Sequence, residues 1–589
     1  MEFTQEQLAA IRHGKGPALV TAGPGAGKTA VLTARVRRLL EDDPKGRVLV
    51  ISFTVSASLE LEKRLFGNGN APKNVFIGTF HSFFLRMLRV TGILDGVKLV
   101  RREDALSALE EYFEKLGPNA AEEAEQWLDD YDRTRNKGRT FEGPAFSCEG
   151  GTEACDPEAR TVYERYKAEN GLIDYEDMQT LLLRHLREKP ALADYCAGLY
   201  EYVLVDEFQD VNPLQFELLR YFLGPSRNLF AVGDEDQAIY AFRGSDPTLT
   251  VRFEDFFPGS AHYTLYRNFR SGSEIVDASS AFIAHNLARY PKELVSDRGP
   301  GSKIRFVLCR RPAGELERLR DTLLEWHAEG CLYEEMAVLY RTHSQNRAVA
   351  ASLSQAGIPF RSPEKEGVPA DHKVVKLLES FILTANGSAD PDAFETVCRY
   401  FAVPDHLIRE SLRNPDGAMS ALANHPALTL AEREKTEETV GLLRQIAGKP
   451  LPEALRHLWH FGGVADYAER FRQERHLDTD SQNSLFTHVF RIAEEAADAD
   501  EWSGLLRRPF GGGVTLSTVH AAKGLEYRKV WVEGVCKGIF PHPRSVSEDG
   551  LEEERRILYV AMTRARDELC VSGYALGRVN RSAFWEELC

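Results

Sequence analysis

The eight residues Ala22-Gly23-Pro24-Gly25-Ala26-Gly27-Lys28-Thr29 follow an apolar run at 16–22 and precede a stretch of helical pattern. The apolar run is typical of a buried parallel strand. Three glycines allow a tight turn after it, so that backbone N–H groups can face phosphate oxygens. A helix that begins near Lys28 would present its positive N-terminal end to the same anion. The stretch therefore predicts a phosphate-binding loop in an α/β fold.

This loop assigns chemistry to two side chains. We expect Lys28 to reach the β- and γ-phosphates of a nucleoside triphosphate and the Thr29 hydroxyl to ligate Mg²⁺. Ala22 stands where the strict pattern has glycine, so the match is slightly loose. The alternative is a glycine-rich turn before an ordinary helix. The residues expected to contact the nucleotide along the loop are Ala22, Gly23, Pro24, Gly25, Ala26, Gly27, Lys28, Thr29 and Ala30.

A second apolar run, at 201–205, ends in the acidic pair Asp206 and Glu207. Such a strand end suits Asp206 to hold magnesium, directly or through water. Glu207 could then orient and deprotonate the attacking water. The alternative is an acidic helix cap, because a helical pattern begins at Asn212-Pro213, and capping and catalysis can coexist. Together with the phosphate loop, the pair predicts hydrolysis of a nucleoside triphosphate.

Length and charge limit the possible classes. A chain of 589 residues is too long for one hydrophobic core, so several domains are expected. The 73 basic and 89 acidic residues give a net charge of −16, which argues against a broad basic surface. A local basic groove, which suffices to bind a single strand of nucleic acid, is compatible with this charge.

The nine cysteines are scattered, and only Cys148 and Cys155 lie close together. Their spacing, without a second pair, makes a poor zinc site, so we expect reduced cytosolic thiols. The N-terminus lacks a basic and apolar signal, and no run of about 18 apolar residues occurs. We therefore expect a soluble cytoplasmic protein without a membrane partner.

Strand and helix patterns alternate in two series, which predicts two α/β domains with parallel sheets. Further strands of the first series are expected at 48–53, 75–80, 228–233 and 263–265. Strands of the second series are expected at 303–308, 336–340, 514–518, 530–533 and 568–572. A helical, charged stretch interrupts each series, and a Gly/Pro-rich patch at 136–158 is typical of a long loop.

These patterns predict a first domain in two parts, 1–87 and 199–263, with a helical insertion at 88–198. They predict a second domain in two parts, 264–362 and 511–589, with a helical insertion at 363–510.

Seven further segments resemble helicase motifs. VGDEDQAIYAFRG at 232–244, LYRNFRS at 265–271, VTLSTVHAAKGLEY at 514–527 and EEERRILYVAMTRA at 552–565 are similar to the third to sixth motifs of one family. FT at 53–54 with GTFHS at 78–82 match motifs between the two ATPase boxes, and FTQEQ at 3–7 resembles an adenine-reading glutamine motif. Along the chain the motifs occur in the order of the UvrD/Rep/PcrA family of superfamily 1 helicases, which this sequence resembles.

The resemblance implies two RecA-like P-loop domains with ATP in the cleft between them, each with a mainly helical insertion. By the same resemblance, Gln7 would read adenine, and Phe269, where many relatives have Tyr, would stack on it. Glu526 would meet the ribose. The residues implied to contact or sense the γ-phosphate are Arg35, Gln237, Arg270 and Arg564.

The resemblance also implies a path for single-stranded DNA, lined by Phe53, Thr54, Thr79, His81, Tyr240, Phe242, Arg243, Thr518 and His520. Aromatic side chains give bases a sequence-tolerant stacking surface. Each role has a structural alternative. The phenylalanines could be core aromatics, the histidines satisfied structural residues, and Arg243 a member of a surface ion pair.

The chain departs from the family pattern in places. Phe242 replaces a common Trp, which should weaken stacking without removing it. In the second insertion Val403-Pro404 is followed by DHLI at 405–408, where relatives carry a Gly-Ile-Gly turn thought to touch duplex DNA. The resemblance puts duplex engagement in doubt for this chain.

The resemblance implies an ATP- and Mg²⁺-dependent 3′→5′ single-stranded DNA translocase and helicase, with a role in DNA repair or recombination. Its implied substrates are single-stranded DNA and junctions of single- and double-stranded DNA. One alternative is a translocase that strips proteins from DNA without processive unwinding. Another is a DNA-binding regulatory subunit with a secondary ATPase, against which the intact Lys28, Asp206, Glu207, Arg270 and Arg564 argue.

Overall fold

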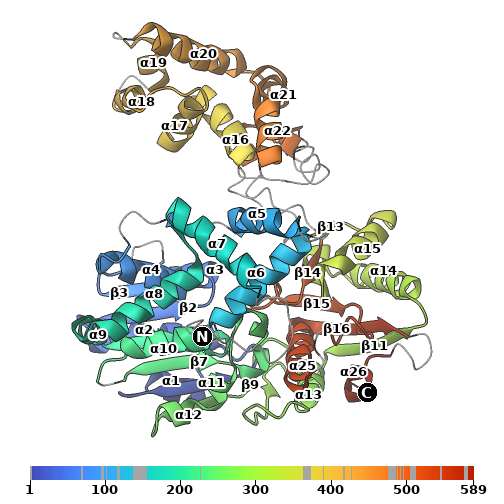
Figure 1. The fold of residues 1–589 in the computed structure, drawn as a ribbon. Coiled ribbons are helices and arrows are strands. Elements are labelled where there is room, and N and C mark those ends of the chain that lie inside the picture. Colours follow the sequence, from blue (N-terminus) through green and yellow to red (C-terminus); the bar gives the residue numbers. More distant parts are fainter. Residues whose placement is uncertain are drawn as a thin grey trace. The chain divides into compact units, whose positions relative to one another are not determined.

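The structure is a computed structural model that divides into two compact units, Met1–Ile358 with Leu516–Cys589, and Pro359–Thr515. Figure 1 shows the ribbon of both units with their helices and strands. The residues described are 3–67, 71–94, 98–100, 102–115, 120–136, 156–225, 227–362, 373–388, 390–414, 418–425, 428–474, 486, 489–490, 492–494, 496–499, 501–503, 513–543, 545, 547–575 and 581–588.

The first unit contains two parallel sheets, and the first of them carries the phosphate loop. Its strand order is β3-β2-β6-β7-β1-β8. Parallel register places Val20 of β1 beside Val232 of β7, and Val50 of β2 beside Leu204 of β6. The strands are β1 (Ala18–Ala22), β2 (Val48–Ser52), β3 (Val75–Thr79), β6 (Tyr202–Val205), β7 (Leu229–Gly233) and β8 (Ala261–Leu265).

Helices cover both faces of this sheet, because successive apolar residues along its strands point to opposite faces and enter two different cores. Ala18 and Val20 share one core with helices α1 (Gln5–Ile11), α2 (Lys28–Asp42) and α3 (Val55–Phe66). Leu19, between them, belongs to the core on the other face. That second core is formed with α4 (Phe80–Val90), α8 (Tyr175–Glu188), α9 (Pro190–Ala197), α10 (Pro213–Tyr221), α11 (Thr248–Val251) and α12 (Phe253–Phe256).

The first insertion has a core of its own, and it is smaller than 88–198. Helices α5 (Arg102–Phe113), α6 (Ala120–Asn136) and α7 (Pro157–Asn170) share a cluster around Leu109, Trp127 and Tyr163. Helix α8 lies in the predicted insertion but buries Met178 and Leu182 in the core of the first sheet. Helix α4 runs through the predicted boundary at 87/88. Two short strands, β4 (Lys98–Leu99) and β5 (Leu172–Ile173), pair beside this insertion. Most of the expected Gly/Pro-rich loop, 137–155, lies outside the described residues.

The second sheet follows the order β11-β16-β15-β12-β14 in the first unit. Its strands are β11 (Lys303–Cys309), β12 (Met336–Tyr340), β14 (Val514–Thr518), β15 (Tyr527–Val532) and β16 (Ala565–Tyr574). Parallel register joins β11 to β16, β16 to β15, and β15 to β12. Two parallel sheets with helical insertions confirm the predicted fold class.

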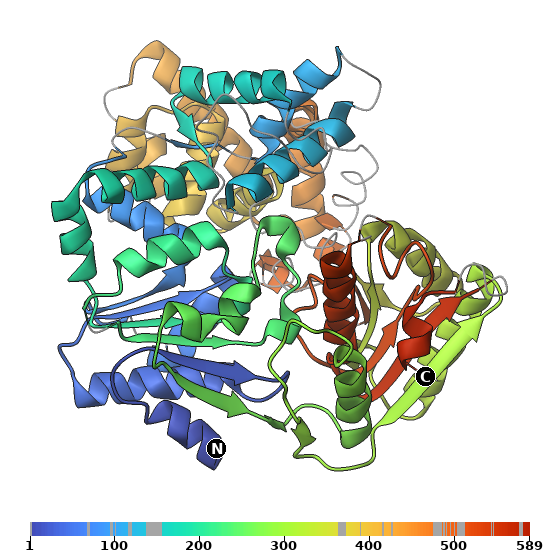
Figure 2. The same cartoon turned by 60° about the horizontal axis from the view of Figure 1, so that its bottom comes forward.

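Helices also cover this second sheet on both faces. Val530 and Val532 of β15 share a core with α13 (Ser273–Ile283), α25 (Glu548–Met562) and α26 (Phe584–Leu588). Lys529, on the opposite face of β15, lies over Trp326 of α14 (Pro312–Ala328), with α15 (His343–Gln355) along β12. Figure 2 shows the green chain after β8 passing from the first sheet to α13, beside the dark red α25.

This connection begins slightly later than predicted. β8 pairs with β1 as far as Leu265, so residues 264 and 265 still belong to the first sheet, beyond the predicted boundary at 263. After it, β9 (Arg267–Asn268) and β10 (Val295–Ser296) pair in parallel. The fourth motif therefore lies where the chain leaves one sheet for the other.

Among its described residues, the second unit is helical apart from β13 (Phe360–Arg361) and the start of β14, which pair with each other. Its main core gathers around Leu378, Leu443 and Trp502. Its helices include α16 (Lys373–Ala385), α17 (Pro391–Tyr400), α18 (Asp405–Leu412), α19 (Ala418–Ala423), α20 (Leu430–Ile446), α21 (Leu451–Phe461) and α22 (Val464–Glu474). Residues 511 and 512 of the predicted Gly511–Gly513 break lie outside the described residues.

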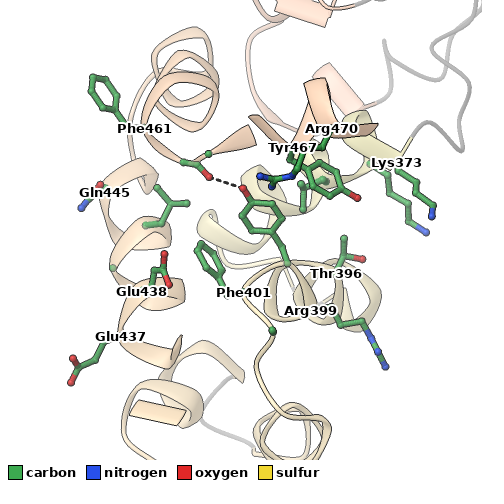
Figure 3. A pocket seen from close by; sticks show the side chains of 18 residues that line it. Lys373, Thr396, Arg399, Phe401, Glu437, Glu438, Gln445, Phe461, Tyr467 and Arg470 are labelled. Atoms are coloured by element: carbon green, nitrogen blue, oxygen red, sulfur yellow. Dashed lines mark hydrogen bonds between the residues drawn. The ribbon is translucent and has the colours of Figure 1, made fainter. Parts of the chain in front are cut away.

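A groove of about 1140 Å³ lies among α16, α17, α20, α21 and α22 (Figure 3). Its basic side chains include Lys373, Arg399 and Arg470, and Glu437 and Glu438 line it as well. The Tyr400 hydroxyl donates to the Gly462 carbonyl at 2.9 Å, which fixes one wall. The lining charges are mixed, so the groove is not a uniformly basic surface.

Within the described ranges, no helix is long and apolar enough to cross a membrane. In the same residues, no group of three or more His, Cys, Asp or Glu side chains could hold a metal ion. The described cysteines are free thiols, and Cys148, Cys155 and Cys589 lie outside the described residues.

Candidate active site

The phosphate loop joins β1 to α2 and has the backbone that its glycines permit. Gly25 and Gly27 have φ of 66° and 82°, in the left-handed region that favours glycine. Gly27 is the N-cap of α2, and glycine has no side chain that could cap the helix. The first N–H groups of α2 therefore have no hydrogen-bond acceptor from an N-cap side chain. This arrangement is a ready anion site.

The loop is also packed too tightly for side chains at two glycines. A Cβ at Gly25 would come within 2.6 Å of the Arg270 Cβ, and one at Gly23 within 2.5 Å of the Leu294 side chain. The Asn268 amide donates to the Pro24 carbonyl at 2.8 Å, and the Phe269 N–H donates to the Gly25 carbonyl at 3.0 Å. The fourth motif therefore lies directly against the phosphate loop.

The acidic pair follows β6, as predicted. Lys28, the first residue of α2, places its Nζ 3.6 Å from Glu207 Oε2. Burial, and then the neighbouring Glu207, raise the pKa of Asp206 to about 7. Burial acts to raise the pKa of Glu207 as well, but Lys28 and Lys523 outweigh it and hold this pKa below its usual value. Glu207 is thus the member of the pair that stays ionised and has a carboxylate able to accept a proton.

The carboxylates of the pair and the Thr29 hydroxyl are donor types that fit Mg²⁺. Asp206 is buried, and a nearby cation would relieve the cost of ionising it there. Carboxylate and hydroxyl oxygens are the hard ligands that magnesium prefers. Thr29 follows Lys28 in the first turn of α2, and Lys28 contacts the neighbour of Asp206.

Two arginines of the sixth and fourth motifs approach this end of the first sheet. Arg564 is buried, and its Nη2 donates to Gln237 Oε1 at 3.1 Å. Arg270 donates from Nε to Glu526 Oε2 at 2.8 Å and from Nη1 to the Thr563 carbonyl at 3.2 Å. Burial, and then Arg270, lower the pKa of Arg564 to about 9. Two guanidinium groups are therefore held close together, an arrangement that an anion would stabilise.

At the adenine end, Gln7 is the third residue of α1 and forms a capping box with Thr4. Its Nε2 donates to the Ala26 carbonyl at 3.0 Å, which ties α1 to the phosphate loop. The Phe269 ring is 38% exposed, and the side chain of Glu526 is 46% exposed. All three predicted residues thus flank the loop, two of them open to a ligand.

The prediction for Arg35 is wrong. Its guanidinium is buried and donates to the carbonyls of Ile11, His13 and Gly14. These carbonyls precede β1, whereas the phosphate loop follows β1, so a strand length separates Arg35 from the phosphates. Arg35 fixes the turn after α1, and Ala30 in the first turns of α2 offers no charge in its place.

Sequence reasoning missed two residues next to the predicted set. Lys523 Nζ donates to Asp210 Oδ2 at 2.6 Å and to the Gln237 carbonyl at 2.8 Å. Gln209 donates to Glu207 Oε2 at 2.5 Å and accepts from the Asp234 N–H at 2.8 Å. Lys523 lies inside the segment 514–527 that resembles the fifth motif, and Gln209 lies in the short helical turn Phe208–Asp210 after the acidic pair, so the available signal was a polar side chain close to the predicted residues.

An aromatic strip lies beside these residues, composed of Phe53, Tyr240, Phe242 and His520. Phe53 and Tyr240 are stacked at 4.9 Å, and Phe242 meets His520 edge-on at 5.4 Å. Arg243 lies 5.4 Å from the Tyr240 ring and 5.5 Å from the Phe242 ring. Phe242 is 43% exposed, which excludes the core alternative for this residue.

The two predicted histidines are neutral at ordinary pH. Burial, and then Arg243, lower the pKa of His81 to about 4. Burial, and then Arg341 and Lys523, lower the pKa of His520 to about 3. The His81 ring packs edge-on against Tyr175 at 5.0 Å. Neither histidine therefore supplies a positive charge for phosphates.

The three predicted threonines act as local caps at strand ends. The Thr54 hydroxyl accepts from the Ala57 N–H at 3.2 Å, and the Thr79 hydroxyl accepts from the Ser82 N–H at 3.3 Å. The Thr518 hydroxyl accepts from the Ala521 N–H at 3.3 Å. Thr79 and Thr518 are buried and Thr54 is exposed. Their contact with DNA stays a prediction.

Comparisons with known proteins agree with this geometry. Residues 3–258 match the model of the UvrD/REP helicase N-terminal domain, and residues 263–386 and 471–575 match that of the UvrD-like helicase C-terminal domain. The chain belongs to the UvrD/REP helicase family. It is by membership an ATP-dependent DNA helicase, as the motifs predicted. The matches leave out 387–470, the part of the second unit in which the family turn is absent.

Relatives cover nearly the whole chain. It is 30% identical over 618 residues to the putative ATP-dependent DNA helicase YjcD of Bacillus subtilis, covering 98% of this chain and 80% of that protein. It is 28% identical over 615 residues to the ATP-dependent DNA helicase PcrA of Staphylococcus epidermidis, covering 97% of this chain and 83% of that protein. A further PcrA, from Staphylococcus aureus, is 27% identical over 612 residues, covering 96% of this chain and 82% of that protein.

Proposed function

We propose that this helicase uses ATP and Mg²⁺ to move 3′→5′ along single-stranded DNA and to separate strands at single- to double-stranded junctions. Its task would be DNA repair or recombination. The direction and the task rest on the family resemblance. The roles of individual residues are supported by their arrangement in the first unit.

In this proposal the phosphate loop and Lys28 hold the phosphates, while Gln7 and Phe269 receive the adenine and Glu526 the ribose. The left-handed glycines and the start of α2 support the first assignment. The exposed Phe269 ring supports the second, because a stacking surface must be open to its partner. Thr29 and Asp206 would hold Mg²⁺, which supplies neutralisation of phosphate charge when bound.

Glu207 would accept the proton of the attacking water, since its lowered pKa keeps it ionised. Gln237, Arg270 and Arg564 would bind the γ-phosphate. The single observation that carries this proposal is the bond from Arg564 Nη2 to Gln237 Oε1, at 3.1 Å, between the two sheets. Phosphoryl transfer depends mainly on positioning and charge stabilisation, which arginines from a second domain provide.

Coupling to DNA would pass through the aromatic strip. Lys523 contacts Asp210 and Gln237 at the nucleotide end, and its Nζ lies 4.7 Å from the Tyr240 ring centroid. The Ala241 N–H donates to Glu553 of α25 at 3.1 Å. A movement of the second sheet relative to the first would therefore move the residues on which bases are proposed to stack.

The test is an ATPase assay with and without single-stranded DNA, followed by unwinding of duplexes with a 3′ or a 5′ tail. We expect DNA to stimulate hydrolysis and only the 3′-tailed duplex to be unwound. Unwinding from a 5′ tail alone would contradict the proposed direction.

A second candidate is a translocase that strips proteins from DNA without processive unwinding. The absence of the family match at 387–470, where the Gly-Ile-Gly turn is missing, favours it. Displacement of streptavidin from a biotinylated single strand, with no unwinding of a tailed duplex, would support this candidate. A regulatory subunit with a secondary ATPase is disfavoured by the intact Lys28, Glu207 and Arg564.

A further inference from the structure

Lys292 is a fully buried lysine that faces three carboxylates. It lies in the segment between α13 and β10, outside every motif quoted above. Its Nζ is 2.6 Å from Asp234 Oδ1, 2.9 Å from Glu235 Oε1 and 3.0 Å from Asp236 Oδ2. A buried ammonium persists only with such compensation, so these contacts fix its position.

Neighbours of Lys292 complete the same contact. Arg289 forms two bonds to Asp236, at 2.9 and 2.8 Å, and the Tyr290 N–H donates to Glu235 Oε1 at 2.8 Å. Leu294 covers Gly23 of the phosphate loop. One short segment therefore binds the third motif at its middle and the phosphate loop at its end.

Asp234 joins Lys292 to the nucleotide end. Its Oδ1 faces Lys292, while its Oδ2 accepts from Gln237 Nε2 at 2.5 Å. An ionised carboxylate only accepts hydrogen bonds, so it fixes which end of the Gln237 amide carries the donor. The amide oxygen is then left to accept from Arg564 Nη2. In the reversed orientation, the amide oxygen of Gln237 would face the Asp234 carboxylate, and its NH₂ group would face the Arg564 donor.

We infer that Lys292 is a positioning residue for ATP hydrolysis, acting through Asp234 to hold the Gln237 amide in the orientation that receives Arg564. The inference rests on the γ-phosphate roles proposed for Gln237 and Arg564. Without the ammonium, Asp234 would be one of three buried carboxylates, and Arg289 bonds Asp236 rather than Asp234. Asp234 would then turn or take up a proton, and a protonated carboxyl can donate to the reversed amide.

Lys167 provides a matched control. Its Nζ is buried in α7, 2.6 Å from Asp174, 2.7 Å from Asp177 and 3.1 Å from Glu164. Lys167→Met and Lys292→Met thus each remove a buried ammonium that faces three carboxylates, and we expect a comparable cost in folding stability. Only Lys292 is joined to Gln237 through a shared carboxylate.

The experiment measures steady-state ATPase with saturating single-stranded DNA for Lys292→Met, Gln237→Ala, their double variant and Lys167→Met. We expect Lys292→Met to lower kcat by about 10-fold or more and to leave the KM for ATP within about 2-fold, since orientation and not binding is lost. The double variant should lose no more than Gln237→Ala alone, because both act at one amide. Lys167→Met should keep the parental kcat.

A parental kcat in Lys292→Met, beside an impaired Gln237→Ala, would overturn the inference and leave the proposed function intact. So would a double variant whose loss is the product of the two single losses. A parental kcat in Gln237→Ala would overturn both. If Lys292→Met does not fold, Asp234→Asn serves instead, because it leaves two cations and two carboxylates in the cluster. An Asn can present either end to Gln237, so kcat should again fall, and a parental kcat would overturn the inference.

Discussion

The nucleotide end and the aromatic strip lie side by side in the first unit, but hydrogen bonds and charges hold the first, whereas ring packing holds the second. At the nucleotide end, Gln237 is bound by Asp234 and Arg564 through directional bonds, and these side chains are buried. In the strip, Phe53 and Tyr240 pack ring on ring, and Phe242 is largely exposed. Hydrolysis needs charges held in one geometry, whereas stacking accepts any base. Substitutions at the two places should therefore fail in different ways.

The largest effect is expected at the arginines. Arg270→Ala or Arg564→Ala should lower ATP turnover by about 10³–10⁵, the value of an arginine finger, and spare nucleotide binding. Lysine should rescue poorly because it lacks the planar fork that reaches Gln237 and the Val560 carbonyl together. A nucleotide-binding titration beside steady-state ATPase is the measurement. Parental turnover in both alanine variants would show that neither is a finger.

Lys28→Ala should come next. The substitution removes the cation at the start of α2 and also the partner of Glu207 at 3.6 Å. Removing such a stabilising group costs about 10²–10³ in turnover. Binding to single-stranded DNA should survive, because the strip is untouched, and fluorescence anisotropy with a labelled oligonucleotide checks this. Near-parental ATPase would refute the phosphate-loop assignment.

Phe242→Ala tests the strip itself. If a base stacks on this ring, DNA affinity and DNA-stimulated ATPase should fall by the worth of one stacked base, about 1–3 kcal/mol, with basal ATPase nearly unchanged. Because the ring is 43% exposed, the thermal midpoint should move much less than for a fully buried Phe. Unchanged DNA affinity in a stable variant would remove Phe242 from the path.

The smallest effect is expected from the second unit. Replacing 363–510 by a Gly/Ser linker leaves β13 and β14 in place and both sheets of the first unit complete. Single-strand translocation, followed by a fluorophore at the DNA end, should persist. Loss of translocation in a folded deletion variant would make the second unit part of the motor.

The sequence predicted those features that depend on a short run of neighbouring residues. The strand before Gly23 and the strand before Asp206 are apolar runs with polar ends, and both occur as predicted. Arg35 could not be placed, because a helical pattern does not say which end of the neighbouring strand a long side chain reaches. The assignment of α8 to an insertion failed for a related reason, since amphipathic spacing marks a buried face without naming the core it joins.

The buried position of Lys292 could not be predicted from the residues around it in the sequence. A lysine between Pro291 and Glu293 has the signature of an exposed loop, and lysines are almost never buried without partners. Its three partners stand 56 to 58 positions earlier in the chain, and only the folded connection between the sheets brings them together. The motif pattern supplied Asp234, Glu235 and Asp236 but not Lys292, the cation that contacts all three.

Lys523 has a consequence for how force could leave the nucleotide. Its Nζ lies 2.6 Å from Asp210 Oδ2 and 4.7 Å from the centroid of the Tyr240 ring. One side chain therefore contacts both the nucleotide end and the aromatic strip. If the strand path runs over Tyr240, a shift of Lys523 relative to Asp210 would also change its distance from that ring, so the opening of the cleft would reach the strand through a single side chain.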